Sequence, residues 1–283
     1  MAELLKGKEV VDALNEKLKA DVKLLNEKGI TPTLGIIRIG EKPEDISYEK
    51  GAMKRAETIG IEVNNYVFDE KITQNKLLKV ILEINQDPGV DGILLFRPLP
   101  KHIDDTVIRK ALLASKDVDG ITDESMAGVF SGTELGYPPC TPEACMEILN
   151  HYQIDLTGKK VAIIGRSLVV GKPAAMMVLQ KNGTPTICHT KTKDMEAICQ
   201  EADVLIVAAG KPKAISAAYL NEKQTVIDVG INMTEDGKLC GDVDFEEAEK
   251  IVKAITPVPG GVGTVTTSML MKHVVEAAWR TLK

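Results

Sequence analysis

A stretch near the middle of the chain combines a short apolar run with closely spaced glycines. Residues 161–164 are all apolar, the pattern of a strand buried on both faces, and Gly165 ends the run. A helix-favouring run begins at Gly171. A strand, a glycine turn and a helix N-terminus form an anion site, because free backbone N–H groups and the positive end of the helix dipole face the anion. Ser167 and Val170 replace the second and third glycines of G-x-G-x-x-G, so an ordinary strand-to-helix turn is the alternative.

The residues after the next expected strand indicate which dinucleotide this turn would bind. A fold that prefers NAD has an acidic residue about 20 positions after the glycine turn, which holds the ribose 2′-hydroxyl. Residues 186–191 contain no acid. Thr190 and Lys191 would instead donate to a 2′-phosphate, and Arg166 could pair with it as a fork. We therefore expect NADP as the cofactor, the alternative being that Lys191 is a solvated loop lysine.

The composition of the chain indicates which kinds of molecule the protein is expected to bind and which it is not. A chain of 283 residues is long enough for two domains, and its formal net charge of -6 argues against a nucleic acid, which demands a basic surface. The odd number of cysteines, five, does not indicate a disulfide framework, and the N-terminus lacks the apolar segment of a signal peptide. No apolar run approaches the ~18 residues of a membrane span. We expect a cytoplasmic protein that binds neither nucleic acid nor membrane.

The first half of the chain alternates helical and strand patterns. Helices are predicted over residues 10–25, 45–59 and 77–84, and strands over residues 34–39, 61–68 and 92–96. This order implies a mostly parallel sheet. Residues 115–140 break the rhythm with several glycines and prolines, which predicts a long loop that is functional or disordered.

The second half begins with a helix predicted from Pro142 to Tyr152, with Thr141 as its N-cap. Its apolar runs are nearly uninterrupted, as a doubly wound sheet requires. These strands are predicted at residues 161–164, 186–188, 204–208, 226–229 and 254–256. Residues 256–263 are too rich in Pro and Gly for a regular element. The last predicted helix, residues 267–282, is expected to pack on the first domain through Leu270, Val274, Val275 and Ala278.

Seven stretches of the chain together resemble one family. They are DGILLFRPLP (91–100), KDVDGI (116–121), PCTPEA (139–144), GRSLVVGKP (165–173), DVGIN (228–232), GDVDF (241–245) and TPVPGGVG (256–263). Each motif is weak alone, but seven in the right order over nearly the whole chain are specific. The chain resembles the methylenetetrahydrofolate dehydrogenase/methenyltetrahydrofolate cyclohydrolase family.

This resemblance implies an α/β fold of two domains with a cleft between them. Residues 1–145, completed by the C-terminal helix 267–283, would form the folate-substrate domain, and residues 146–266 a doubly wound, Rossmann-type NADP domain. Hydride would pass from the methylene carbon of 5,10-methylenetetrahydrofolate to the nicotinamide. In bifunctional members water then hydrolyses the methenyl product to 10-formyltetrahydrofolate, and neither step needs a metal. The resemblance also implies a homodimer that forms through the cofactor domain.

Site residues follow from the resemblance position by position. Tyr48 would stack on the pterin, and Asp119 would bind it, since a carboxylate can accept a pair of N–H donors; both are candidate catalytic residues. Pro259 and Gly260 would line the folate side. Without the resemblance, Asp119 would be interpreted as a loop acid and Tyr48 as a half-buried helix side chain. The cofactor contacts implied by the resemblance are Gly165, Arg166, Ser167, Gly171, Thr190 and Ile231.

Two positions depart from the bifunctional pattern. Bifunctional members have a lysine four residues after the tyrosine, on the same helix face, and a glutamine before the leucine-proline turn. This chain has Ala52 and Phe96 at these positions. A lysine can take part in proton transfer, whereas a methyl group and a phenyl ring cannot. We therefore expect a dehydrogenase with little or no cyclohydrolase activity.

Three alternatives remain open at this stage. The first is a fully bifunctional enzyme in which Arg97, Lys50 or Lys54 replaces the lysine, although an arginine is a poor base. The second is a catalytically silent folate-binding protein, against which the cofactor turn argues. The third is an NADP dehydrogenase for a small acid, which would use a lysine or histidine in its cleft. The histidines lie outside the folate-side motifs and are His102, His151, His189 and His273.

Overall fold

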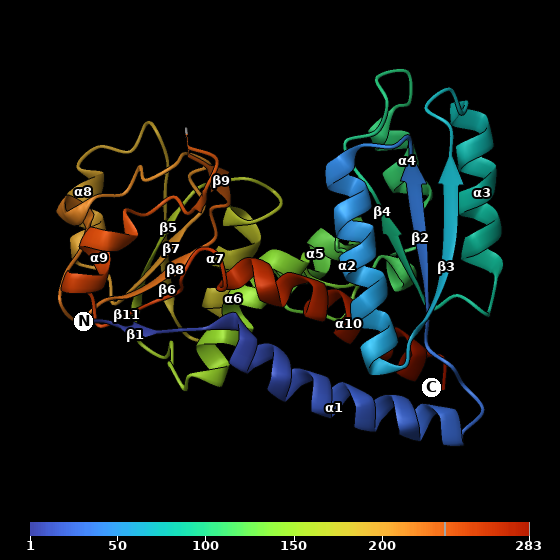
Figure 1. The fold of residues 1–283 in the computed structure, drawn as a ribbon, viewed down its shortest axis with the longest axis horizontal. Helices are drawn as coiled ribbons and strands as arrows, with labels where there is room; N and C mark the ends of the chain where they lie inside the picture. The colour runs from blue at the N-terminus through green and yellow to red at the C-terminus, as the bar shows by residue number, and fades with distance from the viewer. Residues whose placement is uncertain (235, 283) are drawn as a thin grey trace. The chain divides into compact units, whose positions relative to one another are not determined.

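The computed structural model describes residues 1–234 and 236–282, which form two compact units. The three-stranded unit comprises Ala13–Cys140 and the chain from Thr267 onward, and the six-stranded unit comprises Met1–Asp12 and Thr141–Thr266. The first twelve residues thus lie outside the unit in which the sequence analysis places them. The reason is that β1 (Glu3–Leu4) pairs in parallel with β11 (Ala254–Ile255), as Figure 1 shows.

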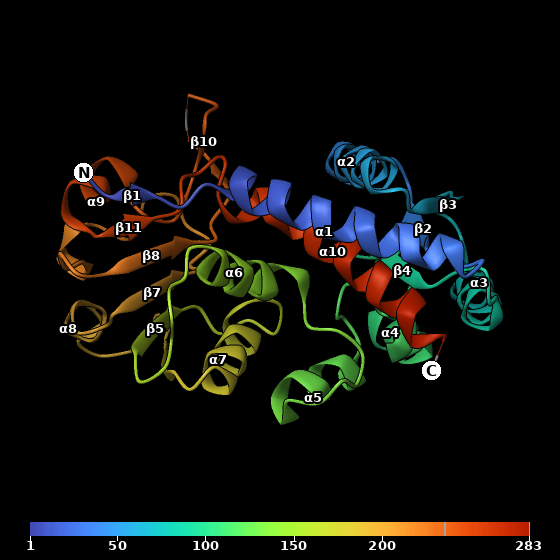
Figure 2. The same cartoon turned by 90° about the horizontal axis from the view of Figure 1, so that it is seen from below.

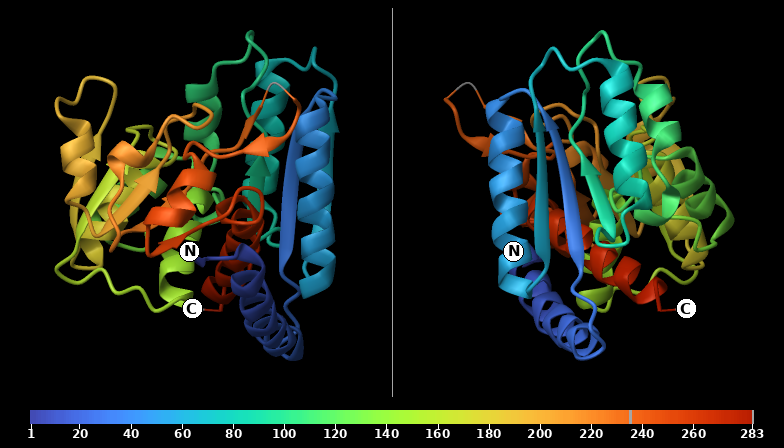
Figure 3. Two further views of the ribbon diagram at one scale, coloured as in Figure 1. Left: turned by 60° about the vertical axis from the view of Figure 1, so that its left-hand side comes forward. Right: turned by 90° about the vertical axis from the view of Figure 1, so that its right-hand side faces the viewer.

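The three-stranded unit is built on a parallel sheet whose middle strand is flanked by the two later ones. In spatial order the strands are β3 (Glu62–Phe68), β2 (Thr33–Ile39) and β4 (Gly92–Leu95). Ile37 and Ile39 join the core that includes Leu77 and Ile108, whereas Arg38, on the other face, is paired with Glu49. Figure 3 shows helices on both faces of this sheet.

The helices of this unit begin and end at residues with a clear physical role. Thr73 caps α3 by accepting a hydrogen bond from the backbone N–H of Lys76, and Gly60 ends α2 in the left-handed conformation with φ of 93°. The helices that lie wholly or mostly in this unit are α1 (Gly7–Glu27), α2 (Pro43–Ile59), α3 (Gln74–Gln86), α4 (Asp105–Ala111), α5 (Asp123–Ser131) and α10 (Val262–Arg280), with a 3₁₀ turn at Ala114–Lys116.

The prediction of a long loop over residues 115–140 is wrong, because α5 lies within it. Thr122 caps α5 by accepting from the backbone N–H of Ser125, and Gly132 ends it. Gly128 interrupts the helical pattern of the sequence. The folded protein needs glycine at this position, because a side chain there would collide with the carbonyl oxygen of Leu135. Sequence propensity counts this glycine against a helix, whereas tertiary packing requires it.

The six-stranded unit is a fully parallel sheet in the spatial order β1-β11-β8-β7-β5-β6. This arrangement confirms the predicted doubly wound, Rossmann-type α/β class, and Figure 2 shows the sheet with its helices. The strands not yet given are β5 (Lys160–Ile164), β6 (Thr184–Cys188), β7 (Val204–Val207) and β8 (Thr225–Asp228). The helices are α6 (Cys140–His151), α7 (Gly171–Gln180), α8 (Met195–Gln200) and α9 (Phe245–Ile251), with a 3₁₀ turn at Ala217–Tyr219.

Several boundaries and short elements differ from the sequence analysis. Helix α6 begins at Cys140 rather than after Thr141, and α10 begins at Val262, inside the stretch expected to be irregular. An antiparallel hairpin of β9 (Asn232–Met233) and β10 (Leu239–Cys240) was not expected, nor was β1. Two-residue strands are too short to carry a period that a sequence could reveal.

The described helices were also compared with the requirements of a bilayer. None of the helices in the described part of the chain combines the length and the apolar character that crossing a membrane requires.

Candidate functional site

The spatial order of the six-stranded sheet reverses beside β5. Strand β6 lies on one side of β5, and the following strand, β7, lies on the other. Ligands of open α/β sheets bind at such a reversal, outside the carboxyl ends of the strands. Gly165 follows β5 at this point with φ of 130°, and a Cβ there would lie 2.5 Å from the carbonyl oxygen of Ala208, which follows β7. The fold therefore places the glycine turn at the position where a ligand is expected.

The turn from Gly165 to Gly171 folds tightly onto itself. A Cβ on Gly171 would collide with the carbonyl oxygen of Gly165, so both positions exclude side chains. The hydroxyl of Ser167 accepts a hydrogen bond of 3.0 Å from the backbone N–H of Val170, and α7 begins at the next residue. Arg166 is exposed. The glycine cradle at a helix N-terminus fits a phosphate group.

The loop that would contact the ribose of the cofactor follows strand β6. Cys188, the last residue of β6, is the register partner of Ile164, and its carbonyl accepts a 2.9 Å hydrogen bond from the N–H of Gly165. Thr190 and Lys191 come directly afterwards and are both exposed. The backbone pairing thus brings these two polar side chains to the strand end beside the glycine turn, as the sequence analysis requires.

Two buried carboxylates organise the loops that carry Ile231. Asp242 accepts hydrogen bonds from the backbone N–H groups of Ala209, Gly210 and Lys211 and from the amide of Asn232, at 2.6 to 3.0 Å. Asp228 accepts from the N–H groups of Gly230, Asp242 and Val243. Burial raises the pKa of Asp228 to about 6.

These two acids were quoted in motifs of the sequence analysis but were given no role there. Side chains at Gly230 and Gly241 would collide with them, which accounts for the glycines in DVGIN and GDVDF. Ile231 lies between Gly230 and Asn232 with 64% of its surface exposed. The acids therefore fix the backbone on both sides of an apolar side chain that is available to a ligand.

Pro259 and Gly260 form an exposed turn of the six-stranded unit. Gly260 has φ of 104°, a conformation that favours glycine, and its carbonyl accepts a 2.8 Å hydrogen bond from the N–H of Gly7. The turn is thereby tied to the N-terminal segment. The structure does not bring Pro259 and Gly260 into the unit that holds Tyr48 and Asp119.

An aromatic pair lies in the three-stranded unit at the carboxyl end of β4. The rings of Tyr48 and Phe96 meet edge to face, with centroids 5.9 Å apart and an interplanar angle of 84°. The backbone N–H of Phe96 donates to the carbonyl of Ile37 at 3.0 Å, which fixes it beside β2. Tyr48 is 37% exposed, whereas Ala52, one helical turn later, is fully buried. Tyr48 is thus partly accessible to solvent, while the fully buried Ala52 contributes only packing.

The charged groups near this pair have other partners. Arg97 forms a bidentate ion pair with Asp105, with both N···O distances at 2.6 Å, and this pairing lowers the pKa of the Asp105 carboxyl. Lys42 donates to the carbonyl of Pro98 at 3.2 Å. Arg97 is therefore held by an acid rather than left to orient a water molecule.

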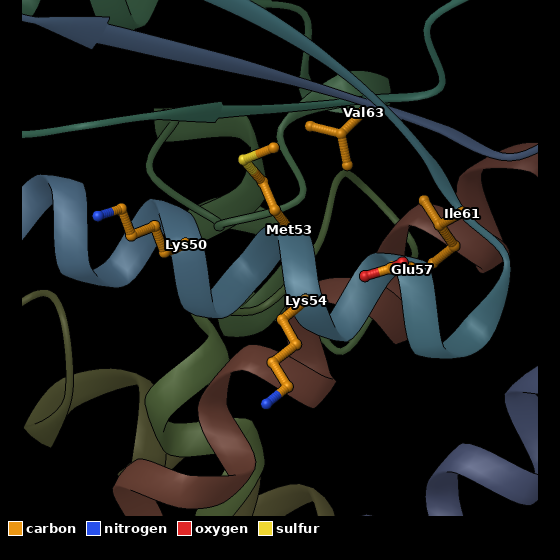
Figure 4. Close-up of a pocket in the computed structure, with 6 residues that line it drawn as sticks. All are labelled: Lys50, Met53, Lys54, Glu57, Ile61 and Val63. Carbon is orange, nitrogen blue, oxygen red and sulfur yellow. The ribbon is translucent and has the colours of Figure 1, made fainter.

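Lys50 and Lys54 line a shallow hollow on another face of α2. The helix contributes Met53 and Glu57 to the same hollow, which Figure 4 shows together with Ile61 and Val63. At 100° per residue, each lysine lies about 200° around the helix from Tyr48 or Ala52. The hollow contains none of the predicted site residues, and we assign it no ligand.

Asp119 lies in a loop whose geometry is fixed by its neighbour Asp117. Asp117 is fully buried and accepts hydrogen bonds from the N–H groups of Ile121 and Thr122 and from the hydroxyl of Ser125. Asp119 itself is partly exposed. Burial, together with the charge of Asp117, raises the pKa of the Asp119 carboxyl to about 6. The loop therefore presents an acceptor that is ionised at neutral pH and partly dehydrated.

Two residues near Asp119 were missed by the sequence analysis. His273 of α10 hydrogen-bonds through Nδ1 to the carbonyl of Val118 at 2.7 Å, and Cys140 lies 3.5 Å from the same oxygen. The PCTPEA motif contained Cys140, but no sequence signal pointed to His273. A contact between residues this far apart in the chain appears only in the folded protein.

Comparisons with known proteins show the family to which this chain belongs. Residues 5–119 match the family model "Tetrahydrofolate dehydrogenase/cyclohydrolase, catalytic domain", and residues 139–282 match its "NAD(P)-binding domain". The chain belongs to the tetrahydrofolate dehydrogenase/cyclohydrolase family. The two matches contain the Asp119 loop and the glycine turn, respectively.

Members of the tetrahydrofolate dehydrogenase/cyclohydrolase family are similar to this chain over almost its whole length. A protein of Carboxydothermus hydrogenoformans named bifunctional protein FolD is 50% identical over 279 residues, 98% of this chain and 97% of that protein. The solved structure of bifunctional FolD from Campylobacter jejuni has a TM-score of 0.96 and 42% identity, over 99% of this chain and 100% of that one. Trypanosoma brucei FolD, solved with NADP and an inhibitor, has a TM-score of 0.92 and 29% identity, over 100% and 99% of the two chains.

The names of these relatives bear on the second activity. Each of the three is named for both activities or as FolD. Their names support the bifunctional alternative better than the expected loss of cyclohydrolase activity. The effect of Ala52 and Phe96 in this chain stays a prediction.

Proposed function

We propose that this protein oxidises 5,10-methylenetetrahydrofolate to 5,10-methenyltetrahydrofolate with NADP. The proposal is carried by the presence in one chain of two features: a glycine cradle without side chains in one unit, and a partly dehydrated carboxylate with a partly exposed tyrosine in the other. NADP, when bound, accepts the hydride, and the protein supplies binding and orientation.

The residues of the three-stranded unit would hold the pterin. Asp119, ionised at neutral pH, accepts a pair of N–H groups from the pterin ring, a planar recognition that a carboxylate performs well. Tyr48, which is partly exposed, stacks on the ring, and Phe96 holds the tyrosine by its edge-to-face contact.

The residues of the six-stranded unit would hold the cofactor. The backbone of Gly165 and Gly171 admits the pyrophosphate at the N-terminus of α7, with Arg166 and Ser167 at its rim. Thr190 and Lys191 donate to the 2′-phosphate. Ile231 packs on the nicotinamide side, and Pro259 and Gly260 line the folate side.

A cofactor comparison tests this assignment. Wild type and the Lys191→Ala variant are assayed with methylenetetrahydrofolate and either NADP or NAD. We expect wild type to form NADPH, and the variant to have about a tenfold higher KM for NADP with little change for NAD, because one charged contact to the 2′-phosphate is lost. Lys193→Ala, a neighbouring exposed lysine, is the matched control. A wild-type preference for NAD would overturn the cofactor assignment.

The second candidate function is the hydrolysis of the methenyl product to 10-formyltetrahydrofolate, which the names of the relatives favour. In this chain, neither Ala52 nor Phe96 can move a proton, Arg97 is paired with Asp105, and Lys50 and Lys54 line a different helix face. These contacts support our narrower proposal that hydrolysis is slow and that the dehydrogenase reaction is the main activity.

Measuring both half-reactions on one preparation separates the two candidates. We expect NADPH formation, with methenyltetrahydrofolate hydrolysis close to the spontaneous rate. The double variant Ala52→Lys, Phe96→Gln tests whether the missing groups restore hydrolysis. Rapid hydrolysis by wild type would establish the bifunctional enzyme, whereas absence of NADPH formation would leave a silent folate-binding protein.

We also propose a homodimer that forms through the six-stranded unit, in the cytoplasm. Strand β6 is an edge strand of its sheet, and Ile187 within it is 36% exposed. Leu179 of the adjacent α7 is 56% exposed. An edge strand with apolar neighbours is a surface that a second copy can cover. The cytoplasmic location is supported by the five cysteines, all of which are free.

A further inference from the structure

His273 is a fully buried side chain that the proposed reaction does not use, yet it contacts the loop of the pterin-binding acid. Its Nδ1 lies 2.7 Å from the carbonyl oxygen of Val118, the residue before Asp119. A carbonyl only accepts hydrogen bonds, so Nδ1 carries the proton and donates it. The histidine thereby provides a hydrogen-bond donor for the backbone carbonyl that precedes the Asp119 carboxylate.

The orientation of this imidazole is set by packing within the same unit. The ring of Tyr137 lies 5.0 Å from that of His273, centroid to centroid, with a tilt of 35°. The guanidinium carbon of Arg280 lies 4.2 Å from the centroid of the Tyr137 ring, and Arg280 also donates to the carbonyl of Gly136 at 3.1 Å. The ring that serves Val118 is therefore part of a buried stack.

The thiol of Cys140 has a choice of acceptors. Its sulfur lies 3.5 Å from the Val118 carbonyl oxygen and 3.9 Å from Nδ1 of His273. Nδ1 carries a proton and cannot accept. The carbonyl oxygen can accept from the thiol with its second lone pair, but it already holds the shorter bond from His273, which makes it the weaker acceptor. A second acceptor is the Asp119 carboxylate, to which Cys140 hydrogen-bonds and whose pKa this bond lowers. The thiol has one proton to donate, and a hydrogen bond to an ionised carboxylate is stronger than one to a neutral carbonyl.

We propose that His273 is a positioning residue for the pterin-binding carboxylate: by satisfying the Val118 carbonyl, it directs the Cys140 thiol proton to Asp119. This inference rests on the proposed function, since it assigns Asp119 to the folate. It adds two residues that orient the acid without touching the substrate.

The sign of the expected pH effect follows from the groups that face Asp119. Asp117, in the same loop, raises its pKa, whereas Cys140 of α6, His273 of α10 and Arg97, after β4, lower it. Loss of the thiol bond therefore raises the pKa of the Asp119 carboxyl. Because only the ionised form accepts the N–H groups of the pterin, folate binding then fails at a higher pH.

The test compares His273→Leu, Cys140→Ala and the double variant. The KM for methylenetetrahydrofolate and kcat are measured from pH 5.5 to 8.5. We expect the acid limb of kcat/KM to move up by about half to one pH unit in each single variant, which is a threefold to tenfold higher KM near pH 6. The KM at pH 8.5 and the kcat at saturation stay near wild type.

The pH shift in the double variant is the most specific test of the proposal. Each single change weakens the same thiol bond, so the double shift is smaller than the sum of the two single shifts. Cys140→Ser, which keeps a donor, restores most of the wild-type profile. Cys145→Ala, which removes another buried thiol of α6, leaves the limb unmoved. His273→Phe fills the space without a donor and replaces His273→Leu if that protein does not fold.

Several results would overturn the inference. One is a shift of the acid limb of kcat/KM in the double variant that equals the sum of the two single shifts. The others are an acid limb that does not move in the folded His273 variant, or a shift in Cys145→Ala as large as that in Cys140→Ala. Wild-type NADPH formation separates this failure from that of the proposed function. Without NADPH formation the function itself is wrong, whereas activity with coincident pH profiles rejects only the role of His273 and Cys140.

Discussion

At the scale of single residues, the chemistry of this protein depends on carboxylates with different surroundings. Asp117 is enclosed by three donors and shapes a loop, whereas Asp119 beside it keeps some solvent exposure. Burial raises the pKa of both carboxyls. Asp228 and Asp242 perform a structural task in the other unit, where they gather backbone N–H groups. The same side-chain type is thus either enclosed by donors or left partly exposed, and only Asp119 has the exposure that the proposed binding role requires.

Replacement of Asp119 by Asn tests its assignment to the pterin. The amide keeps the size but loses the charge and one acceptor, so we expect kcat/KM for methylenetetrahydrofolate to fall about 100-fold at pH 7.5. The KM for NADP stays near wild type. Glu124→Gln, which neutralises an exposed acid of α5, is the control. Equal losses in both variants would remove Asp119 from the site.

The same Asp119→Asn variant has an opposite effect on stability. A carboxyl whose pKa is raised on folding, here from 3.8 to about 6, binds its proton more tightly in the native state. Its ionisation therefore costs stability as pH rises through that window, and the cost is complete above it. We expect the variant to gain on the order of 1–3 kcal/mol over wild type at pH 7.5, where that cost applies.

Urea denaturation of both proteins at pH 4 and pH 7.5 measures this difference. The gain at pH 4 should be smaller than at pH 7.5, since the wild-type carboxyl is then mostly protonated in the native state. A stability difference that does not change between the two pH values would show that the carboxyl carries no burial cost.

At the scale of elements, each unit has candidate site residues at the carboxyl ends of parallel strands. Phe96 follows β4, Gly165 follows β5 and Thr190 lies just after β6. Middle strands β2 and β5 each have neighbours on both sides, so loops from several strands gather at one edge. The positions of these residues are consequences of strand order rather than of local sequence.

The glycine cradle gives a prediction at this scale. Gly171→Ala places a methyl group against the carbonyl oxygen of Gly165 and must displace the turn. We expect the KM for NADP to rise at least tenfold, with a smaller change in the KM for the folate. Lys172→Ala, an exposed neighbour in the same helical turn, is the control. Unchanged NADP binding in Gly171→Ala would mean that the cofactor phosphates lie elsewhere.

At the scale of the whole molecule, the chain crosses three times between its two units, after Asp12, Cys140 and Thr266. Residues 1–12 enter the six-stranded unit through β1, and the last helix returns to the three-stranded unit, where His273 contacts the Asp119 loop. Each unit is therefore completed by a segment distant in sequence. A truncation at either terminus removes part of a core rather than a separate tail.

The proposed homodimer gives a prediction at this scale. Ile187→Arg places a charge on the edge strand β6, so we expect the protein to elute as a monomer in size-exclusion chromatography with light scattering. Val67→Arg makes the same change on β3, the edge strand of the other sheet, where Val67 is 50% exposed. That control should remain dimeric. A monomeric wild type, or a dimer lost only in Val67→Arg, would contradict the proposed interface.

Much of the fold was predictable from the sequence because the relevant signals are local. The strands at residues 34–39 and 204–208 and the buried face of α10 appear where apolar spacing indicates them. Helix α5 was missed, since Gly128 lowers local helix propensity but is required by the carbonyl of Leu135. Strand β1 was missed because it has two residues and depends on β11.

The sequence by itself determined the α/β class, the glycine turn, the motifs that resemble one family and the absence of acid after β6. Each of these depends on residue type and short spacing. Only the tertiary structure revealed that His273 serves the Asp119 loop, that Arg97 is held by Asp105, and that the first residues complete the six-stranded sheet. Some of these contacts join residues that are remote in sequence, and in the others a charged group has more than one partner within reach. In both cases the packing of the folded chain decides which contact forms.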